Sequence, residues 1–237
     1  MTNWTLAYDY FEPKEEGLRE ALTSTGNGYF CTRGALSWSE ADGVSYPGTY
    51  MHGGFNRETT IMAGVPVLNE DLVNLPNWAL LELRIEGEEA VGMENIEILS
   101  YRHEYDIRNA TLIRKLRFRD RAGRETSLHT RRFVSMADMH HAAMEWRITP
   151  ENWSGKMEAI VSLDARVENS GVARYRDLAG RHLDPVSPRT FGPEVIALEA
   201  RTRQSHIYVA EAARTRVYGG DELLSCERSL YQMQDYI

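Results

Sequence analysis

Apolar and charged residues alternate over most of this chain, which is the pattern of half-buried strands. Residues 81–86 read Leu-Glu-Leu-Arg-Ile-Glu, and residues 116–119 repeat the alternation as Leu-Arg-Phe-Arg. Two later rows of apolar residues follow the same period, over 144–148 and 157–163. Because successive side chains of a strand point to opposite faces, this period of two predicts strands with one buried and one solvated face.

The spacing of these strands predicts antiparallel sheets. Residues 116–119 and 126–128 flank a polar turn at 120–124, which is typical of a hairpin. A parallel α/β sheet needs an amphipathic helix between successive strands, and the pattern lacks such helices. We therefore predict an all-β fold, a large antiparallel β-sandwich with one or two short helices.

Three segments depart from the alternation. Residues 14–22 predict a short helix, and its apolar residues share one face: Leu18, Ala21 and Leu22. Residues 222–234 carry apolar residues at helical spacing and predict a second helix. Residues 171–193 mix Gly, Pro, Arg and Asp, so we expect a long loop there, and loops of that length are often functional.

Composition and charge exclude several classes of protein. The 237 residues are 42% hydrophobic and 26% charged, as in an ordinary globular protein, and the formal net charge of -8 provides no basic surface for nucleic acid. No apolar run reaches the roughly 20 residues of a membrane span, and the first residues lack the features of a signal peptide. Cys31 and Cys226 are expected to be free buried thiols, which suits a cytoplasmic location.

The glycine-rich stretch at Gly26, Asn27 and Gly28 is the first candidate site. A phosphate-binding loop is followed by a helix, whose N-terminal amides bind the anion. Residues 29–32 read Tyr-Phe-Cys-Thr, which is the composition of a strand. We therefore predict a tight structural turn that needs positive φ and has no part in phosphate binding.

No catalytic or metal-binding set emerges from the residues. His140 and His141 are adjacent, so on a strand they point to opposite faces and do not share a metal ion. Most carboxylates belong to alternating polar faces, and the distance between two of them on different strands does not follow from spacing. We assign no catalytic residue, no metal ligand and no cofactor.

Two loops combine aromatic and polar residues beside turn residues, namely residues 47–56 and 72–78. Such side chains stack on sugar rings and form hydrogen bonds with their hydroxyls. The candidate substrate-rim residues are His52, Asn74, Asn77 and Trp78. The alternative is that Trp78 is buried under the strand that follows it.

Four stretches together resemble one family. They are TSTGNGYFCTRG at 23–34, PGTYMHGGFN at 47–56, NEDLVNLPNWALLEL at 69–83, and LIRKLRFRDRAGRETSLHTRRFVSMADMHHAAMEWRITPENWSG at 112–155. In this order and approximate spacing they resemble the N-terminal domain of glycoside hydrolase family 65. That family includes maltose, trehalose and kojibiose phosphorylases and acid trehalases. The glycine-rich turn at 26–28 looks like a signature of the family.

The resemblance implies both a fold and a role. It implies a galactose-mutarotase-like β-sandwich, with residues 1–237 forming a single N-terminal domain. The family's (α/α)6-barrel, which carries a glutamate general acid and binds phosphate as a co-substrate, is absent from this chain. We expect an accessory domain whose partners are its own C-terminal barrel and a disaccharide substrate, with a homodimer as one option.

Two other functions remain open at this point. A free-standing mutarotase-like sugar epimerase would need a histidine acid and a carboxylate base in one cleft, with His103, Glu104, His129 and Glu145 as candidates. A carbohydrate-binding module would keep the aromatic rim and need no chemistry. A reading frame that continues past Ile237 would favour the accessory domain over both.

Overall fold

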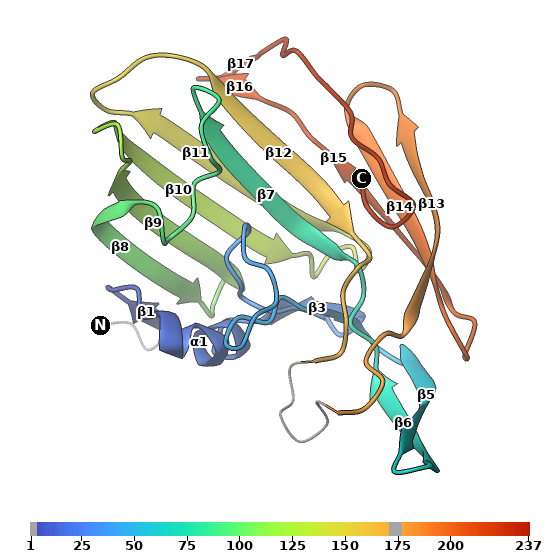
Figure 1. Cartoon of the computed structure of the whole chain (residues 1–237). Coiled ribbons are helices and arrows are strands. Elements are labelled where there is room, and N and C mark those ends of the chain that lie inside the picture. The colour runs from blue at the N-terminus through green and yellow to red at the C-terminus, as the bar shows by residue number, and fades with distance from the viewer. Residues whose placement is uncertain (1–3, 171–176) are drawn as a thin grey trace. The chain divides into compact units, whose positions relative to one another are not determined.

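The computed structural model describes residues 4–170 and 177–237 and consists mainly of strands (Figure 1). This confirms the expected all-β class. The 3-10 helix η1 covers Pro13–Glu15 and the α-helix α1 covers Glu16–Leu22. The strands are β1 (Thr5–Tyr8), β2 (Thr25–Gly26), β3 (Phe30–Thr32), β4 (Thr49–Met51), β5 (Phe55–Met62), β6 (Val65–Leu72), β7 (Asn77–Ile85), β8 (Glu97–Asp106), β9 (Thr111–Arg119), β10 (Glu125–Val134), β11 (Ala142–Pro150), β12 (Met157–Asp164), β13 (Leu183–Phe191), β14 (Val195–Thr202), β15 (Tyr208–Arg214), β16 (Tyr218–Gly219) and β17 (Glu222–Leu223).

The chain forms two compact units. Unit 1 comprises residues 1–47 and 81–160, and unit 2 comprises residues 48–80 and 161–237. The strands β7 and β12 pair with each other, and each contributes residues to both units. No helix among the described residues is both long enough and apolar enough to cross a membrane.

Unit 1 is built on a five-stranded antiparallel sheet in the order β1-β8-β9-β10-β11. The predicted hairpin is confirmed, because Leu116 on β9 lies opposite Leu128 on β10. The inner face of this sheet carries the unit 1 core, since the alternation places apolar side chains there. The buried core residues are Leu83, Ile85, Val91, Tyr101, Leu116, Phe118 and Leu128.

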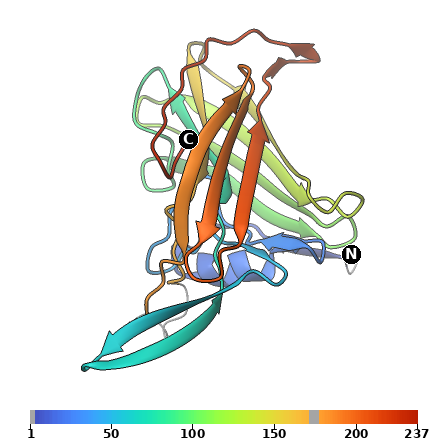
Figure 2. The same cartoon turned by 90° about the vertical axis from the view of Figure 1, so that its right-hand side faces the viewer.

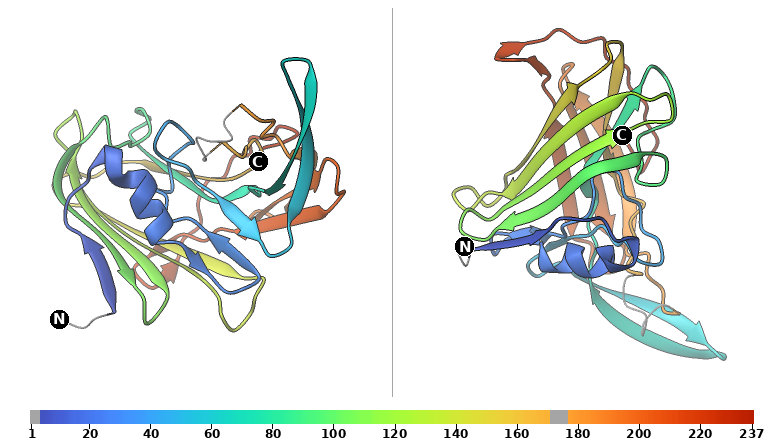
Figure 3. Two further views of the ribbon diagram at one scale, coloured as in Figure 1. Left: turned by 90° about the horizontal axis from the view of Figure 1, so that it is seen from below. Right: turned by 90° about the vertical axis from the view of Figure 1, so that its left-hand side faces the viewer.

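The helix predicted over 14–22 is confirmed by η1 and α1, which lie on the inner face of the five-stranded sheet (Figure 3). The orientation of α1 is unusual. Leu18 and Leu22 are 63% and 51% exposed, whereas the charged residues Glu16, Arg19 and Glu20 are buried. The apolar face of α1 therefore points away from the unit 1 core.

Gly26 is the last residue of β2, and Asn27 and Gly28 lie in the turn that leads to β3. Gly28 has a φ of +83°, a conformation that side chains with a Cβ rarely adopt. A Cβ at Gly26 would lie 2.6 Å from the Cβ of Cys31 on the neighbouring strand. Both glycines are therefore required by the backbone, one for its φ and the other for the close approach of β3.

The side chain of Asn27 holds this turn in place. Its Oδ1 accepts hydrogen bonds from the backbone N–H groups of Tyr29 at 3.0 Å and Phe30 at 3.1 Å. Its Nδ2 donates to the carbonyl oxygens of Ser135 at 2.6 Å and Met139 at 3.0 Å. The turn is thus fastened to the segment between β10 and β11, and the side chain has a structural role.

Unit 2 contains the three-stranded antiparallel sheet β13-β14-β15 and the hairpin β5–β6, which extends beyond that sheet (Figure 2). The long loop expected over 171–193 is wrong for residues 183–191, which form β13; residues 171–176 lie outside the described residues. The prolines of this segment were the reason to expect a loop. A strand tolerates them here because β13 lies at the edge of its sheet and its register shifts between Pro185 and Ser187.

The core of unit 2 is a separate apolar cluster. Its buried members are Val73, Leu75, Leu163, Ala165, Leu183, Leu198, Ala200, Val209 and Ile237. Ile237 joins it through two backbone hydrogen bonds with Leu163, of 2.7 Å and 3.1 Å. The end of the chain is therefore extended and part of the core.

The helix expected over 222–234 is wrong. The segment begins with the short strand β17 and is irregular after it, and its apolar side chains Leu223, Leu230 and Met233 are exposed. Helical spacing of apolar residues stabilises a helix only where they are buried against another element. Cys31 and Cys226 are free, as expected, but both are exposed, so the expected burial is wrong.

Replacing Gly28 with valine tests the turn. Gly28→Val is expected to lower the free energy of unfolding by about 1–3 kcal/mol, because valine strongly disfavours positive φ. Gly43→Val is the matched control, since Gly43 has open space around a Cβ and its φ lies outside the left-handed range. Chemical denaturation of both variants measures the difference. Equal stabilities of the two variants would contradict the positive φ.

Candidate functional site

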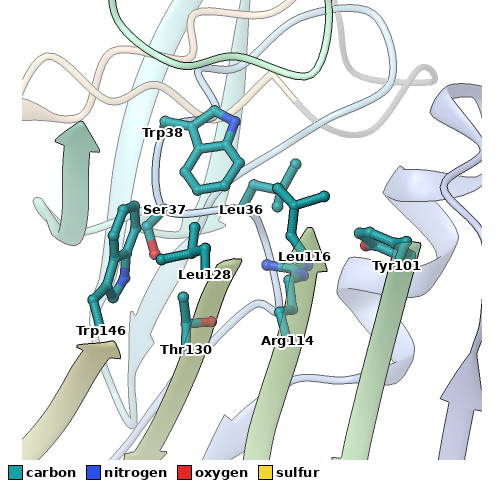
Figure 4. Close-up of a pocket in the computed structure, with 9 residues that line it drawn as sticks. All are labelled: Leu36, Ser37, Trp38, Tyr101, Arg114, Leu116, Leu128, Thr130 and Trp146. Carbon is teal, nitrogen blue, oxygen red and sulfur yellow. The ribbon is translucent and has the colours of Figure 1, made fainter. Parts of the chain in front are cut away.

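A small pocket opens on the inner face of the unit 1 sheet (Figure 4). It is lined by Leu36, Ser37, Trp38, Tyr101, Arg114, Leu116, Leu128, Thr130 and Trp146. Two indole rings, a phenol and a guanidinium are groups that bind sugars. The cavity volume is about 10 Å³, however, which is room for about one water molecule. A sugar ring does not fit in this pocket.

Rows of side chains across the sheet explain this composition. His103, Arg114, Thr130 and Trp146 lie opposite one another on β8, β9, β10 and β11. Figure 4 shows Arg114 between Thr130 and Tyr101. The indole rings of Trp38 and Trp146 meet edge to face with centroids 5.5 Å apart, so they fill much of the space. The aromatic residues pack mainly against each other and against the core.

Two buried arginines on this inner face bind backbone carbonyls. Arg114 donates to the carbonyl oxygens of Ala35 at 2.9 Å and Gly34 at 2.5 Å. Arg132 donates to those of Arg33 at 2.9 Å and Ala35 at 3.2 Å. Burial lowers the pKa of Arg132 to about 9, and the nearby charge of Arg114 acts in the same direction. These guanidinium groups hold the segment 33–35 against the sheet.

The buried carboxylates of α1 complete this ionic cluster. Glu20 accepts hydrogen bonds from the hydroxyl of Ser45 at 2.5 Å and the backbone N–H of Tyr46 at 2.9 Å. Burial raises the pKa of Glu16, and the positive charge of Arg114 opposes that effect. The sequence analysis missed this cluster. The sequence does hint at the cluster, because two arginines occupy positions whose alternation with Leu116 and Val134 predicts an inward side chain. These are Arg114 on β9 and Arg132 on β10.

The candidates for an epimerase do not share one cleft. His103 faces inward with no exposed surface, and neither ring nitrogen has a hydrogen-bond partner among the described residues. Burial lowers the pKa of His103 to about 2, and three neighbouring arginines add to the effect, so the imidazole stays neutral. Glu104, His129 and Glu145 lie on the opposite, outer face, where Glu145 pairs with Arg131. An acid and a base are not combined here.

The four candidate rim residues lie in unit 2 in different environments. His52 is exposed in the turn after β4. Asn74 is 2% exposed, and its Oδ1 accepts a hydrogen bond from the backbone N–H of Thr49 at 3.0 Å. The Oδ1 of Asn77 accepts from the backbone N–H of Ala79 at 3.1 Å. None of the four lines the pocket of Figure 4.

Trp78 is half-buried and packs against the core cluster of unit 2. Its indole Nε1 is buried and has no hydrogen-bond partner among the described residues. A buried indole N–H that lacks a partner costs free energy, which the burial of the large apolar ring offsets. The rim roles of His52, Asn74, Asn77 and Trp78 remain predictions.

Comparison with known proteins identifies the family. The model of "Glycosyl hydrolase family 65, N-terminal domain" matches residues 6–235. This chain belongs to glycosyl hydrolase family 65. An uncharacterized glycosyl hydrolase of Mycobacterium tuberculosis is 42% identical over 91% of the chain, and the trehalose 6-phosphate phosphorylase of Lactococcus lactis is 34% identical over 92%. The kojibiose phosphorylase of Caldanaerobacter subterraneus is 29% identical over 93%.

A solved structure assigned to a kojibiose phosphorylase from the human microbiome shares the fold of this family 65 domain. Its TM-score is 0.82 over 98% of the chain, at 17% identity. The chain covers 29% of that structure, 16% of the M. tuberculosis relative and 27% of the two phosphorylases. The chain thus spans less than a third of the length of each of these four proteins.

Truncation of Trp78 separates its two candidate roles. Trp78→Ala is expected to lower the free energy of unfolding of the chain by about 3 kcal/mol, because a large apolar side chain leaves the core of unit 2. Denaturant unfolding of the purified chain measures this loss. A loss below about 0.5 kcal/mol, as for an ordinary surface substitution, would instead favour the rim role.

The buried neutral imidazole of His103 predicts a pH dependence. Its folded pKa of about 2 lies below the unfolded value near 6.5, so the unfolded chain binds more protons between these values and stability falls as the pH falls. His103→Gln removes this titration. The stability of the wild type relative to this variant is expected to fall by about 1.4 kcal/mol per pH unit below pH 6. Unfolding curves of both proteins at pH 7, 6 and 5 measure this change. A difference in stability that stays constant with pH would mean that the folded pKa of His103 is not lowered.

Proposed function

We propose that this chain is the N-terminal, non-catalytic domain of a longer family 65 enzyme that acts on α-linked glucose disaccharides. The observation that carries the proposal is the extent of the matches. The N-terminal domain model covers residues 6–235, yet the chain spans only 16% to 27% of the relatives described above. The printed names of the relatives, trehalose 6-phosphate phosphorylase and kojibiose phosphorylase, support the substrate class.

The chemistry of phosphorolysis supports a site outside this chain. Phosphate attacks the anomeric carbon, the glycosidic C–O bond breaks, and a general acid protonates the leaving oxygen. Phosphate is the co-substrate of this reaction, and with water as the acceptor the same bond is hydrolysed. Two acids that the sequence offered are unsuitable, since His103 is buried and neutral and Glu145 is paired with arginines. We assign the reaction to the C-terminal barrel that the family resemblance implies.

We assign an accessory role to the single domain formed by residues 1–237. It supports the barrel and lends a loop to the rim of the active site. Among the rim candidates, His52 is the one whose side chain is exposed and free to reach a neighbouring surface. The two free cysteines support a cytoplasmic location for the enzyme.

The isolated chain is expected to be inactive. Purified chain incubated with maltose, trehalose or kojibiose, with and without phosphate, should release no glucose or glucose 1-phosphate above a control without protein. The L. lactis trehalose 6-phosphate phosphorylase, assayed on its own substrate, is the positive control. Disaccharide cleavage above the control without protein, by a clean preparation of the chain alone, would contradict the non-catalytic assignment.

A chimera tests the accessory role independently. The chain replaces the N-terminal domain of the L. lactis enzyme, with which it is 34% identical over 92% of its length. The chimera is expected to be soluble and to retain phosphorolysis, whereas the enzyme without any N-terminal domain is expected to lose solubility or activity. Full activity of the truncated enzyme would show that the domain is dispensable.

A further inference from the structure

The hairpin β5–β6 is attached to the rest of unit 2 through its polar inner face. Its outer face is exposed and carries apolar side chains such as Phe55, Ile61 and Leu68. Asn56 on the inner face is 1% exposed and contacts two other segments of unit 2. One of its contacts is His182, which precedes β13 and is also 1% exposed. A buried titratable group therefore lies where the hairpin is attached.

The contacts of Asn56 fix the orientation of its side-chain amide. The Oδ1 of Asn56 accepts hydrogen bonds from the backbone N–H groups of Gln204 and Ser205, both at 2.9 Å. Because both partners are donors, the oxygen of the amide faces them and the nitrogen faces the other way. That nitrogen, Nδ2, lies 3.0 Å from Nδ1 of His182. An amide nitrogen only donates, so Nδ1 of His182 is the acceptor and carries no proton.

The proton of the neutral imidazole is therefore on Nε2 of His182, which lies 3.2 Å from Oδ2 of Asp71 on β6. The other charged groups around the ring are Glu58 on β5 and Arg203 after β14, and Arg203 also lies 3.5 Å from Asp184 on β13. Burial lowers the pKa of His182, and the charge of Arg203 acts in the same direction, whereas Asp71 and Glu58 oppose the effect. The imidazole is accordingly neutral at pH 7.

A second proton on the ring is incompatible with these contacts. It would bind to Nδ1 of His182 and set that donor against the Nδ2 donor of Asn56. Flipping the amide would set Nδ2 against the two backbone N–H groups, and flipping the ring would set a carbon against Nδ2. We propose that His182 is a pH switch: the neutral imidazole holds the inner face of β5–β6 against unit 2, and protonation releases it. The position of the exposed apolar face then depends on pH, a property beyond the accessory role.

The lowered pKa gives the direction of the pH dependence. When the hairpin opens, water reaches His182 and its pKa returns toward the ordinary value of 6.5. The open form therefore binds more protons than the closed form, and opening is favoured as the pH falls below that value. Between pH 7 and pH 5 the equilibrium constant for opening is expected to rise on the order of tenfold.

Amide hydrogen exchange measured by NMR at pH 7 and pH 5, corrected for the intrinsic pH dependence of exchange, tests the proposal on the purified chain. Opening at the amides of Gln204 and Ser205 and along β5 and β6 is expected to rise on the order of tenfold in acid. The amides of β14 that pair with β15 in the same unit are expected to stay protected. The imidazole nitrogen shifts of His182 are expected to show a proton on Nε2 at pH 7. Equal opening at both pH values, or a proton on Nδ1, would overturn the proposal.

Two variants separate the switch from a general loss of stability in acid. His182→Gln removes the titration and is expected to abolish the rise in opening. Asn56→Asp places a carboxylate oxygen opposite Nδ1, where it accepts a proton from the charged imidazole, so opening is expected to decrease from pH 7 to pH 5. His52→Gln is the matched control, since His52 is an exposed histidine of the same unit, and it is expected to behave as the wild type. A tenfold rise that persists in His182→Gln, or a rise in Asn56→Asp equal to that of the wild type, would contradict the switch. Neither result affects the assignment as a non-catalytic domain.

Discussion

The need to satisfy buried arginines determines how α1 packs on the unit 1 sheet. Arg114 and Arg132 occupy inward positions and lie almost completely out of solvent. A buried guanidinium is costly unless its donors are bonded and its charge is balanced. The carbonyls of residues 33–35 accept their hydrogen bonds, and the buried carboxylates Glu16 and Glu20 supply negative charge. The charged side of α1 must therefore face the sheet, which leaves Leu18 and Leu22 outward.

In unit 2, buried polar contacts likewise determine which face of the β5–β6 hairpin points outward. Its polar face is partly buried, with Asn56 held against His182 and the backbone of Gln204, and its apolar face is exposed. In a domain that functions alone, exposed apolar faces would be a liability for solubility. In a domain that spans less than a third of its family 65 relatives, they are suitable contact surfaces for other protein. The outward apolar faces of α1 and of the β5–β6 hairpin are thus consistent with the accessory role that we propose.

The alternation of apolar and polar residues was sufficient to predict the all-β class, the hairpin at 116–128 and the helix at 14–22. It was not sufficient for the orientation of α1, because the partners of Glu20 and Arg114 lie 25 to 80 residues away in sequence. The prolines in residues 183–191 led us to expect a loop where the edge strand β13 forms. The helical spacing of apolar residues over 222–234 led us to expect a helix, although that segment is not helical. The polar character of Asn74 suggested a rim residue, yet its side chain is buried and bonded to backbone.

The most direct test of the account is the accessibility of the outward apolar residues in the folded monomer. Single cysteines at Leu18, Leu68 and the buried Leu83 are introduced into a Cys31→Ser/Cys226→Ser background, and the rate of maleimide labelling of each variant is measured. The account predicts that Leu18→Cys and Leu68→Cys react nearly as fast as in the unfolded chain, whereas Leu83→Cys reacts only on unfolding. Protection of Leu18→Cys and Leu68→Cys to the level of Leu83→Cys would contradict it, since both apolar faces would then be buried.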